Sequence, residues 1–187
     1  MRMMDEQQLI ADFRKGKRDA QKMVFELHAP AMMAVCIRYV RDRETARDLL
    51  QDGFIRVFEN AESYSGKGPL GAWIRRVIVN TVLEHLRRND ALKMSINIED
   101  HFDYTDSYQP DILNKISTDE ILKCVDELPT GFRTVFNLFA IEDYSHAEIA
   151  SMLNINESTS RSQYMRARNL LQKKLLTLNI TTNELKR

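Results

Sequence analysis

Arginines and small polar side chains recur at helical spacing near the C-terminal end of this 187-residue chain. At about 100° per residue, one side of a helix would present Ser158, Ser162, Met165 and Asn169, and Arg161 and Arg166 flank this side. Guanidinium groups, a small hydroxyl and an adaptable apolar side chain are groups that contact base edges in the major groove of DNA. The stripe therefore predicts a DNA-reading helix, and an amphipathic helix with a solvated basic face is the alternative.

The residues before this helix predict a partner that positions it. Ser145 and Glu148 form an S-x-x-E capping box, which begins a short helix that ends near Leu153. Asn154 follows where the chain has to turn with a positive φ, which Asn tolerates better than other non-glycine residues. The pattern predicts a helix-turn-helix whose second helix packs through Ser160, Tyr164, Ala167 and Leu171.

A second group of candidate binding residues lies in a loop with the sequence AESYSGKG at 61–68. Its members are an aromatic ring, a lysine and the small residues between them: Tyr64, Ser65, Gly66 and Lys67. Glycines let the backbone approach a ligand or bend sharply. An aromatic ring beside a lysine can hold an unstacked base, and a plain turn is the alternative.

The helix after this loop is predicted to run from Pro69 to about Arg88. Arg76, Asn80 and Arg87 fall within roughly 40° of one another on it. A charged stripe is ordinarily a solvated face, but an Asn among arginines beside the glycine-rich loop favours nucleic-acid contact. The side expected to be buried consists of Leu70, Trp73, Ile74, Val77, Thr81 and His85.

A helix predicted at about 44–59, with Asp42 as its cap, has more apolar residues than one narrow stripe needs. Leu49 and Phe54 are therefore expected to meet something beyond the local core. The polar residues beside them are Asp48, Gln51 and Asp52. An exposed apolar pair rimmed by carboxylates is typical of a protein interface, whereas a broad core face with solvated acids is the alternative.

The N-terminal residues predict further helices. One is expected at 6–15, with Asp5 as its cap, and a longer helical stretch begins at Asp19. Pro30 interrupts that stretch, so we expect two helices or a kink at Ala29.

The acidic residues 91–117 have no helical period and predict a flexible linker. Short helices are expected after it, at about 118–128 and 131–141, and the DNA-reading helix is expected to end near Leu176 before a fraying tail. The predicted fold is all-α, with two small helical domains at 1–90 and 118–187.

Composition excludes several classes of protein. Six Gly and four Pro argue against an all-β or low-complexity chain. No apolar run approaches the length of a membrane span, and the N-terminus does not resemble a signal peptide. Cys36 and Cys124 are expected to be reduced thiols, and the four histidines lack the spacing of metal ligands. We therefore expect a cytoplasmic protein without membrane insertion, metal or cofactor.

The formal net charge is zero, but the charges are unevenly distributed. Residues 1–88 carry +4, residues 89–118 carry −4, residues 119–160 carry −6 and residues 161–187 carry +6. A protein that touches a polyanion at two points would have this pattern of two basic regions separated by acidic segments.

The order of these parts resembles that of extracytoplasmic-function sigma factors, the small two-domain class of bacterial transcription initiation factor. Two segments carry the resemblance: ETARDLLQDGFIRVFENAESYSGKGPLGAWIRRVIVNTVLEHLRR at 44–88 and ELPTGFRTVFNLFAIEDYSHAEIASMLNINESTSRSQYMRARNLLQ at 127–172. The family usually has Gly where Asn154 and Ser158 stand, and an aliphatic residue where Ser160 stands. That departure places a small polar residue on the packing face of the second helix.

The resemblance implies partners and roles for the candidate residues. Residues docking on the clamp helices of the RNA polymerase β′ subunit would be Asp48, Leu49, Gln51, Asp52 and Phe54. Residues that open the minus-ten promoter element would come from the Tyr64–Lys67 loop and the helix with Asn80. Residues reading the minus-thirty-five element would be Arg161, Ser162, Met165 and Arg166, with His146 and Thr159 near the phosphates. Members of the family are often held inactive by an anti-sigma factor.

Two other classes of function are alternatives for this sequence. One is an ordinary helix-turn-helix regulator that does not bind core polymerase and uses its first domain for dimerisation or sensing. The other is an enzyme, which the sequence disfavours because it shows no Ser-His-Asp set, carboxylate pair or phosphate-binding loop.

Overall fold

A computed structural model describes residues 6–88 and 117–184 of the chain. Every regular element in these residues is helical, which confirms the predicted all-α class. The chain divides into two compact units, Met1–Leu86 and Arg87–Arg187. The predicted linker lies outside the described residues apart from Ser117, as does Asp5, so the limits of the domains stay predictions.

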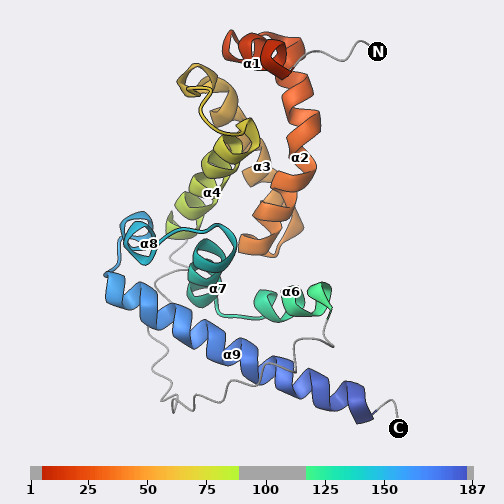
Figure 1. The fold of residues 1–187 in the computed structure, drawn as a ribbon, viewed down its shortest axis with the longest axis vertical. Coiled ribbons are helices and arrows are strands. Elements are labelled where there is room, and N and C mark those ends of the chain that lie inside the picture. The colour runs from red at the N-terminus through yellow and green to blue at the C-terminus, as the bar shows by residue number, and fades with distance from the viewer. Residues whose placement is uncertain (1–5, 89–116, 185–187) are drawn as a thin grey trace. The chain divides into compact units, whose positions relative to one another are not determined.

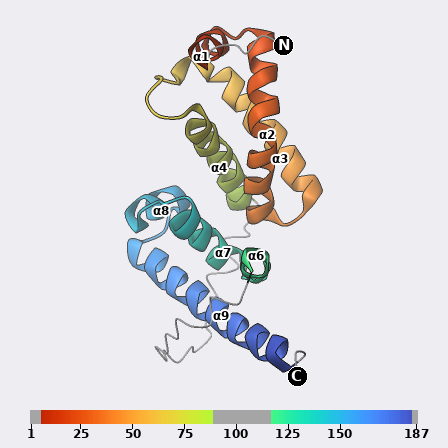
Figure 2. The same cartoon turned by 45° about the vertical axis from the view of Figure 1, so that its right-hand side comes forward.

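The first unit is built from α1 (Glu6–Arg14), α2 (Arg18–Val40), α3 (Arg43–Glu59), the short 3₁₀ turn η1 (Ala61–Ser63) and α4 (Leu70–Arg88). Figure 1 shows α2 and α3 running side by side, and the rotated view in Figure 2 shows the same pairing. Asp42 caps α3 as predicted, because its carboxylate accepts hydrogen bonds from the Thr45 backbone N–H at 2.7 Å and the Thr45 hydroxyl at 2.6 Å.

Aromatic rings from three helices form the centre of this unit. The fully buried ring of Phe13 in α1 lies edge-on to Phe58 of α3 and Trp73 of α4, with centroids 6.5 Å and 6.3 Å away. Gly53 lies against α4, since a Cβ atom there would lie 2.4 Å from the Ile78 side chain. The buried core therefore extends around α3 on more than one side.

α2 differs from the sequence-based expectation. Pro30 lies inside one continuous helix, so the first of the two expected alternatives, two separate helices, was wrong, and a kink at Ala29 stays a prediction. Proline removes a single backbone donor, and packing of the helix on its neighbours outweighs that loss. Among the helices that the structure describes, α2 is also long and apolar enough to cross a membrane, contrary to our expectation. Core helices pass the same test, and α2 buries Val24, Val35 and Tyr39 within the first unit.

The second unit is built from α6 (Thr118–Asp126), α7 (Thr130–Phe136), the π-helical turn η3 (Asn137–Ile141), α8 (His146–Leu153) and α9 (Glu157–Glu184). A core of Val125, Leu128, Phe132, Ala167 and Leu171 joins α6 and α7 to α9. The buried guanidinium of Arg133 donates to the carbonyl oxygen of Asp126, the last residue of α6, at 3.2 Å and to that of Leu128, between α6 and α7, at 3.3 Å.

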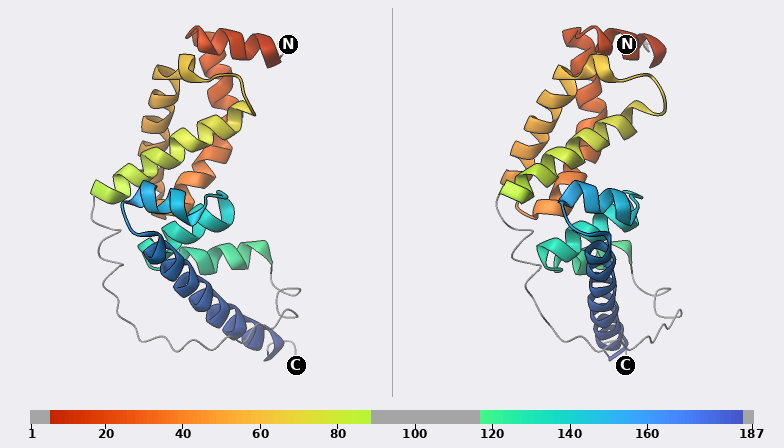
Figure 3. Two further views of the ribbon diagram at one scale, coloured as in Figure 1. Left: turned by 60° about the vertical axis from the view of Figure 1, so that its left-hand side comes forward. Right: turned by 90° about the vertical axis from the view of Figure 1, so that its left-hand side faces the viewer.

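α9 is longer than predicted. It continues to Glu184 as a single helix, so the expected end near Leu176 was wrong, while the fraying of the tail stays a prediction. Both views in Figure 3 show its C-terminal part projecting past α6 and α7. α7 and α8 pack against the N-terminal half of α9.

Candidate nucleic-acid and partner interfaces

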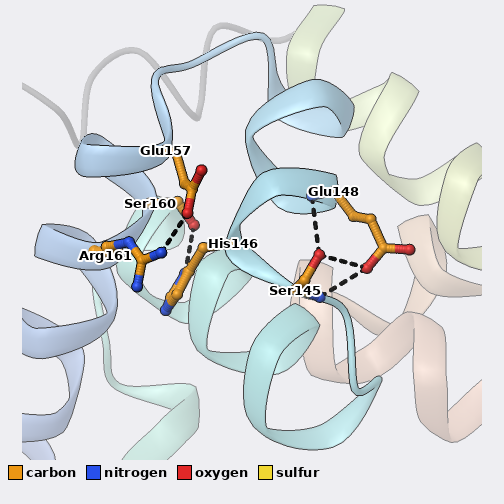
Figure 4. Close-up of polar contacts among 6 residues, drawn as sticks. All are labelled: Ser145, His146, Glu148, Glu157, Ser160 and Arg161. Carbon is orange, nitrogen blue, oxygen red and sulfur yellow. Dashed lines mark hydrogen bonds and ion pairs between the residues drawn. The ribbon is translucent and has the colours of Figure 1, made fainter.

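The capping box that begins α8 forms as predicted. The Ser145 hydroxyl oxygen accepts from the Glu148 backbone N–H at 3.3 Å, and the Glu148 carboxylate accepts from the Ser145 backbone N–H at 2.8 Å (Figure 4). Two backbone donors at the start of the helix are thereby satisfied without tertiary contacts. The side chain of Ile149 then anchors the helix in the core.

The turn between α8 and α9 depends on the conformation of Asn154. Its φ of 55° and ψ of 49° place it in the left-handed region, as the sequence predicted. The backbone N–H of Ile155 then donates to the carbonyl of Ala150 at 3.0 Å, and that of Ser160 donates to the carbonyl of Asn156 at 3.0 Å. The chain therefore turns between α8 and α9 within three residues, and backbone hydrogen bonds form on both sides of the turn.

The two faces of α9 lie close to the predicted positions. Ser160, Ala167 and Leu171 are buried, and Tyr164 stacks against Phe136 with ring centroids 6.0 Å apart. Gln163 is also buried, and the predicted packing stripe did not include it.

The opposite face of α9 presents the predicted reading residues. Arg161 is exposed, while Ser162, Met165 and Arg166 are half-buried. Arg161 forms an ion pair with Glu157 one turn earlier. An exposed pair of this kind contributes only about 0–1 kcal/mol, so Arg161 can exchange it for another anion at small cost. The Ser162 hydroxyl donates to the carbonyl of the half-buried Thr159 at 3.0 Å.

His146 is packed between helices. Its ring lies parallel to that of Phe139 with centroids 4.3 Å apart, and its Nδ1 atom is 2.9 Å from the Ser160 hydroxyl (Figure 4). Burial lowers the pKa of His146, the positive charge of Arg161 lowers it further, and Glu157 opposes both effects. The imidazole therefore favours the neutral form near pH 7. The sequence did not predict the bond between His146 and Ser160, because the two residues are 14 positions apart in different helices.

The glycine-rich loop places its aromatic residue inward. Tyr64 is only 2% exposed, its ring lies 5.6 Å from that of Trp73, and its hydroxyl donates to the Gly68 carbonyl at 2.6 Å. In this conformation both the ring and the hydroxyl of Tyr64 are engaged inside the unit, so the ring is not presented to a base as the sequence predicted. Gly66 and Gly68 have φ values of 76° and 78°, which bend the loop and leave Ser65, Gly66 and Lys67 exposed.

α4 presents the polar stripe that its spacing predicted. Arg76, Asn80 and Arg87 are all exposed. The buried side is broader than expected and includes Ile78 and Val82, whereas the side chains of Trp73, Val77 and His85 are only half-buried. An ion pair of 2.6 Å between Arg56 of α3 and Glu84 of α4 ties the two helices beside this stripe.

The exposed face of α3 corrects part of the predicted docking surface. Leu49 and Phe54 are 4% and 2% exposed, so they do not form the expected exposed apolar pair and instead fit the alternative of a broad core face. The ring of Phe54 instead lies 4.8 Å from that of Phe25 in α2. Asp48, Gln51 and Asp52 are exposed as predicted, and the apolar residue beside them is Ile55, which is 53% exposed. We call Asp48, Gln51, Asp52 and Ile55 the acidic face of α3.

Neither a metal site nor a disulfide is present among the described residues. No group of three His, Cys, Asp or Glu side chains in them could hold a metal ion. Cys36 and Cys124 are both free and buried. Burial raises the pKa of the Cys36 thiol to about 12, which makes it a poor nucleophile.

Comparison with known proteins gives two family matches in tandem. The chain matches Sigma-70 region 2 over residues 24–92 and Sigma-70 region 4 over residues 118–171. The RNA polymerase sigma-H factor of Pseudomonas aeruginosa is 26% identical over 183 residues, which cover 92% of this chain and 95% of that one. The ECF RNA polymerase sigma factor SigW of Bacillus subtilis is 25% identical, covering 90% of this chain and 96% of that one.

Two solved structures share the fold. One is the sigma factor RpoE bound to the anti-sigma factor NepR from Bartonella quintana, with a TM-score of 0.51, 22% identity and coverage of 82% of this chain and 95% of that one. The other is CnrH bound to the cytosolic domain of CnrY, with a TM-score of 0.51, 21% identity and coverage of 90% and 96%. At these identities the likeness is one of fold alone.

Proposed function

The chain belongs to the sigma-70 family, in its extracytoplasmic-function group, and we propose that it directs core RNA polymerase to specific promoters through two separate DNA contacts. One observation carries the proposal: two helical units follow each other in the order of sigma regions 2 and 4, and each has an exposed basic surface. An ordinary helix-turn-helix regulator would need only the second unit for DNA contact and would use the first for dimerisation or sensing.

The outward face of α9 is the proposed reader of the minus-thirty-five element. Arg161 and Arg166 supply guanidinium groups that can bond two acceptors of a guanine edge, while Ser162 and Met165 lie between them on the helix. Thr159 and His146 lie near the starts of α9 and α8, where helix N-termini favour phosphate.

The glycine-rich loop and the polar stripe of α4 form the proposed minus-ten contact. Lys67 is exposed at the loop, with Ser65 and Gly66 beside it. The stripe adds Arg76, Asn80 and Arg87. Cations position the backbone of an opened strand, and the Asn80 amide can bond the edge of an unpaired base. Tyr64 supports this surface from beneath by holding Gly68.

The acidic face of α3 is the proposed docking surface for the β′ clamp helices of core polymerase. Carboxylates around one exposed aliphatic side chain match the usual anatomy of a small protein interface, with an apolar centre and a polar rim. Leu49 and Phe54 act indirectly, by holding α3 in the core.

The remaining parts of the proposal concern organisation and location. We assign residues 1–90 to polymerase docking and promoter opening, residues 91–117 to a linker, and residues 118–187 to minus-thirty-five recognition. The protein is proposed to act in the cytoplasm, without catalysis of its own, and to be open to control by an anti-sigma factor.

Binding of the purified chain to core RNA polymerase, followed by promoter binding of the complex, tests the proposal. Arg166→Ala is expected to leave polymerase binding unchanged and to weaken promoter binding by about 1–3 kcal/mol if Arg166 pairs with a guanine edge. Lys123→Ala is the matched control, because Lys123 is an exposed cation on α6, outside the helix-turn-helix. DNA binding without polymerase binding would instead favour the ordinary regulator.

A further inference from the structure

A polar bond joins the two helices of the helix-turn-helix at its centre. The Nδ1 atom of His146, in the first turn of α8, lies 2.9 Å from the hydroxyl of Ser160 in α9 (Figure 4). Ser160 is fully buried, so its hydroxyl has little access to water. A buried hydroxyl without a partner destabilises a fold, and His146 supplies a partner that an aliphatic neighbour could not.

The imidazole that shares this bond also packs against two aromatic rings, which contact each other at a centroid distance of 4.6 Å. Phe139 of η3 covers one face of the ring at a centroid distance of 4.3 Å and an interplanar angle of 10°. Tyr164 of α9 lies edge-on at 5.8 Å. His146 therefore links η3, α8 and α9, and its Nδ1 atom has one direction in which to bond.

The position of Ser160 lets this bond affect DNA recognition, because Ser160 lies on the same helix as the reading side chains. Ser160 immediately precedes Arg161 and lies on the packing side of α9, opposite Ser162 and Met165. A rotation of α9 about its own axis would break the bond to His146 and turn the reading side chains together. Contacts to base edges need side chains held within about half an ångström by supporting bonds.

We propose that His146 and Ser160 form a polar clamp that sets the rotation of α9, which makes His146 a positioning residue for promoter reading. This inference rests on the proposed function of α9. It gives His146 a role that works through Ser160, whereas a phosphate contact made by His146 would be independent of Ser160. The two roles therefore predict different coupling between the residues.

A double-mutant cycle on the polymerase holoenzyme tests the clamp. His146→Ala, Ser160→Ala and the double variant are assembled with core polymerase, and binding is measured on a promoter fragment selected with the wild-type holoenzyme. Each single variant is expected to weaken binding, and the double variant to bind at least about threefold better than the product of the single effects predicts. Effects that multiply without coupling would overturn the proposal.

Two rescue variants separate positioning from general loss of structure. His146→Asn retains a polar atom near the position of Nδ1 and is expected to recover most of the loss seen with His146→Ala. His146→Phe combined with Ser160→Val replaces the polar bond with apolar packing and is expected to restore binding to within about twofold. Failure of both rescues, in variants that melt well above the assay temperature, would contradict the clamp.

Controls keep the two proposals distinguishable. Ser151→Ala removes a hydroxyl from an exposed position on α8 and is expected to leave promoter binding unchanged. If wild-type holoenzyme selects no promoter, the proposed function itself fails. If it selects a promoter and the cycle shows no coupling, only the clamp fails.

Discussion

Phe54→Ala is expected to destabilise the first unit, whereas Ile55→Ala is expected to weaken polymerase binding. Phe54 is 2% exposed, and its ring centroid lies 4.8 Å from that of Phe25 and 5.8 Å from that of Phe58. Truncating a buried Phe to Ala costs about 3–5 kcal/mol, because transfer energy is lost and a cavity remains. For a unit of this size each kcal/mol shifts the melting temperature by about 4–8 °C, so the expected shift is at least about 12 °C.

Ile55 is the neighbouring control in the same helix. It is 53% exposed, so Ile55→Ala is expected to change stability by no more than about 0.5 kcal/mol. Thermal unfolding followed by circular dichroism measures the first effect, and capture of core polymerase by the folded variants measures the second. Wild-type melting of Phe54→Ala together with lost polymerase binding would refute the burial of Phe54 in the core.

Three further predictions concern the second unit. Asn154→Ala is expected to cost about 1–2 kcal/mol of stability because of the positive φ at this position, while Asn154→Gly is expected to be neutral or stabilising; equal melting of the two variants would argue against the left-handed turn. Ser145→Ala removes one half of the capping box and is expected to cost about 1 kcal/mol in chemical denaturation, and no change would show that the box contributes nothing. The pKa of His146 is lowered in the folded state, so the unfolded chain binds this proton more readily and stability is lost as pH falls below about 6.5 through the folded-state pKa. Between about pH 8 and pH 5, wild type is therefore expected to lose more stability than His146→Asn, and equal losses would contradict the assigned shift.

Local signals in the sequence predicted much of the second unit. The capping box joins Ser145 to Glu148, and the backbone N–H of Asn154 bonds the carbonyl of Ala150. Each feature thus involves residues at most four positions apart, so its geometry follows from local chemistry. The exposure of Arg161 in α9, and of Asn80 in the first unit, also followed from helical spacing, because each lies on the side of its helix away from the core.

Residues that depend on distant contacts were predicted poorly. The surplus of apolar residues in α3 indicated an external partner, but α3 has neighbours on more than one side and buries both Leu49 and Phe54. The helix continues through Pro30 because packing stabilises it, and Tyr64 turns inward because Trp73 and Gly68 offer partners that the loop sequence does not reveal.

Ser160 is a further residue whose surroundings depend on a distant contact. A small polar residue on a packing face indicates a loosely held helix when only its own helix is considered. The structure supplies His146 from the preceding helix, and the hydroxyl becomes a bonded group inside the core. Sequence spacing within one helix contains no signal for a pair that forms between two helices.

Transcription by core polymerase on a library of random upstream sequences tests the central claim most directly. With the wild-type chain we expect enrichment of two short elements at a fixed spacing, as two separate DNA contacts require. Arg166→Ala should relax base preference in the upstream element alone, and Asn80→Ala should impair opening at the downstream element alone. Enrichment of a single element, or transcription no different from that of core polymerase without the chain, would contradict the account.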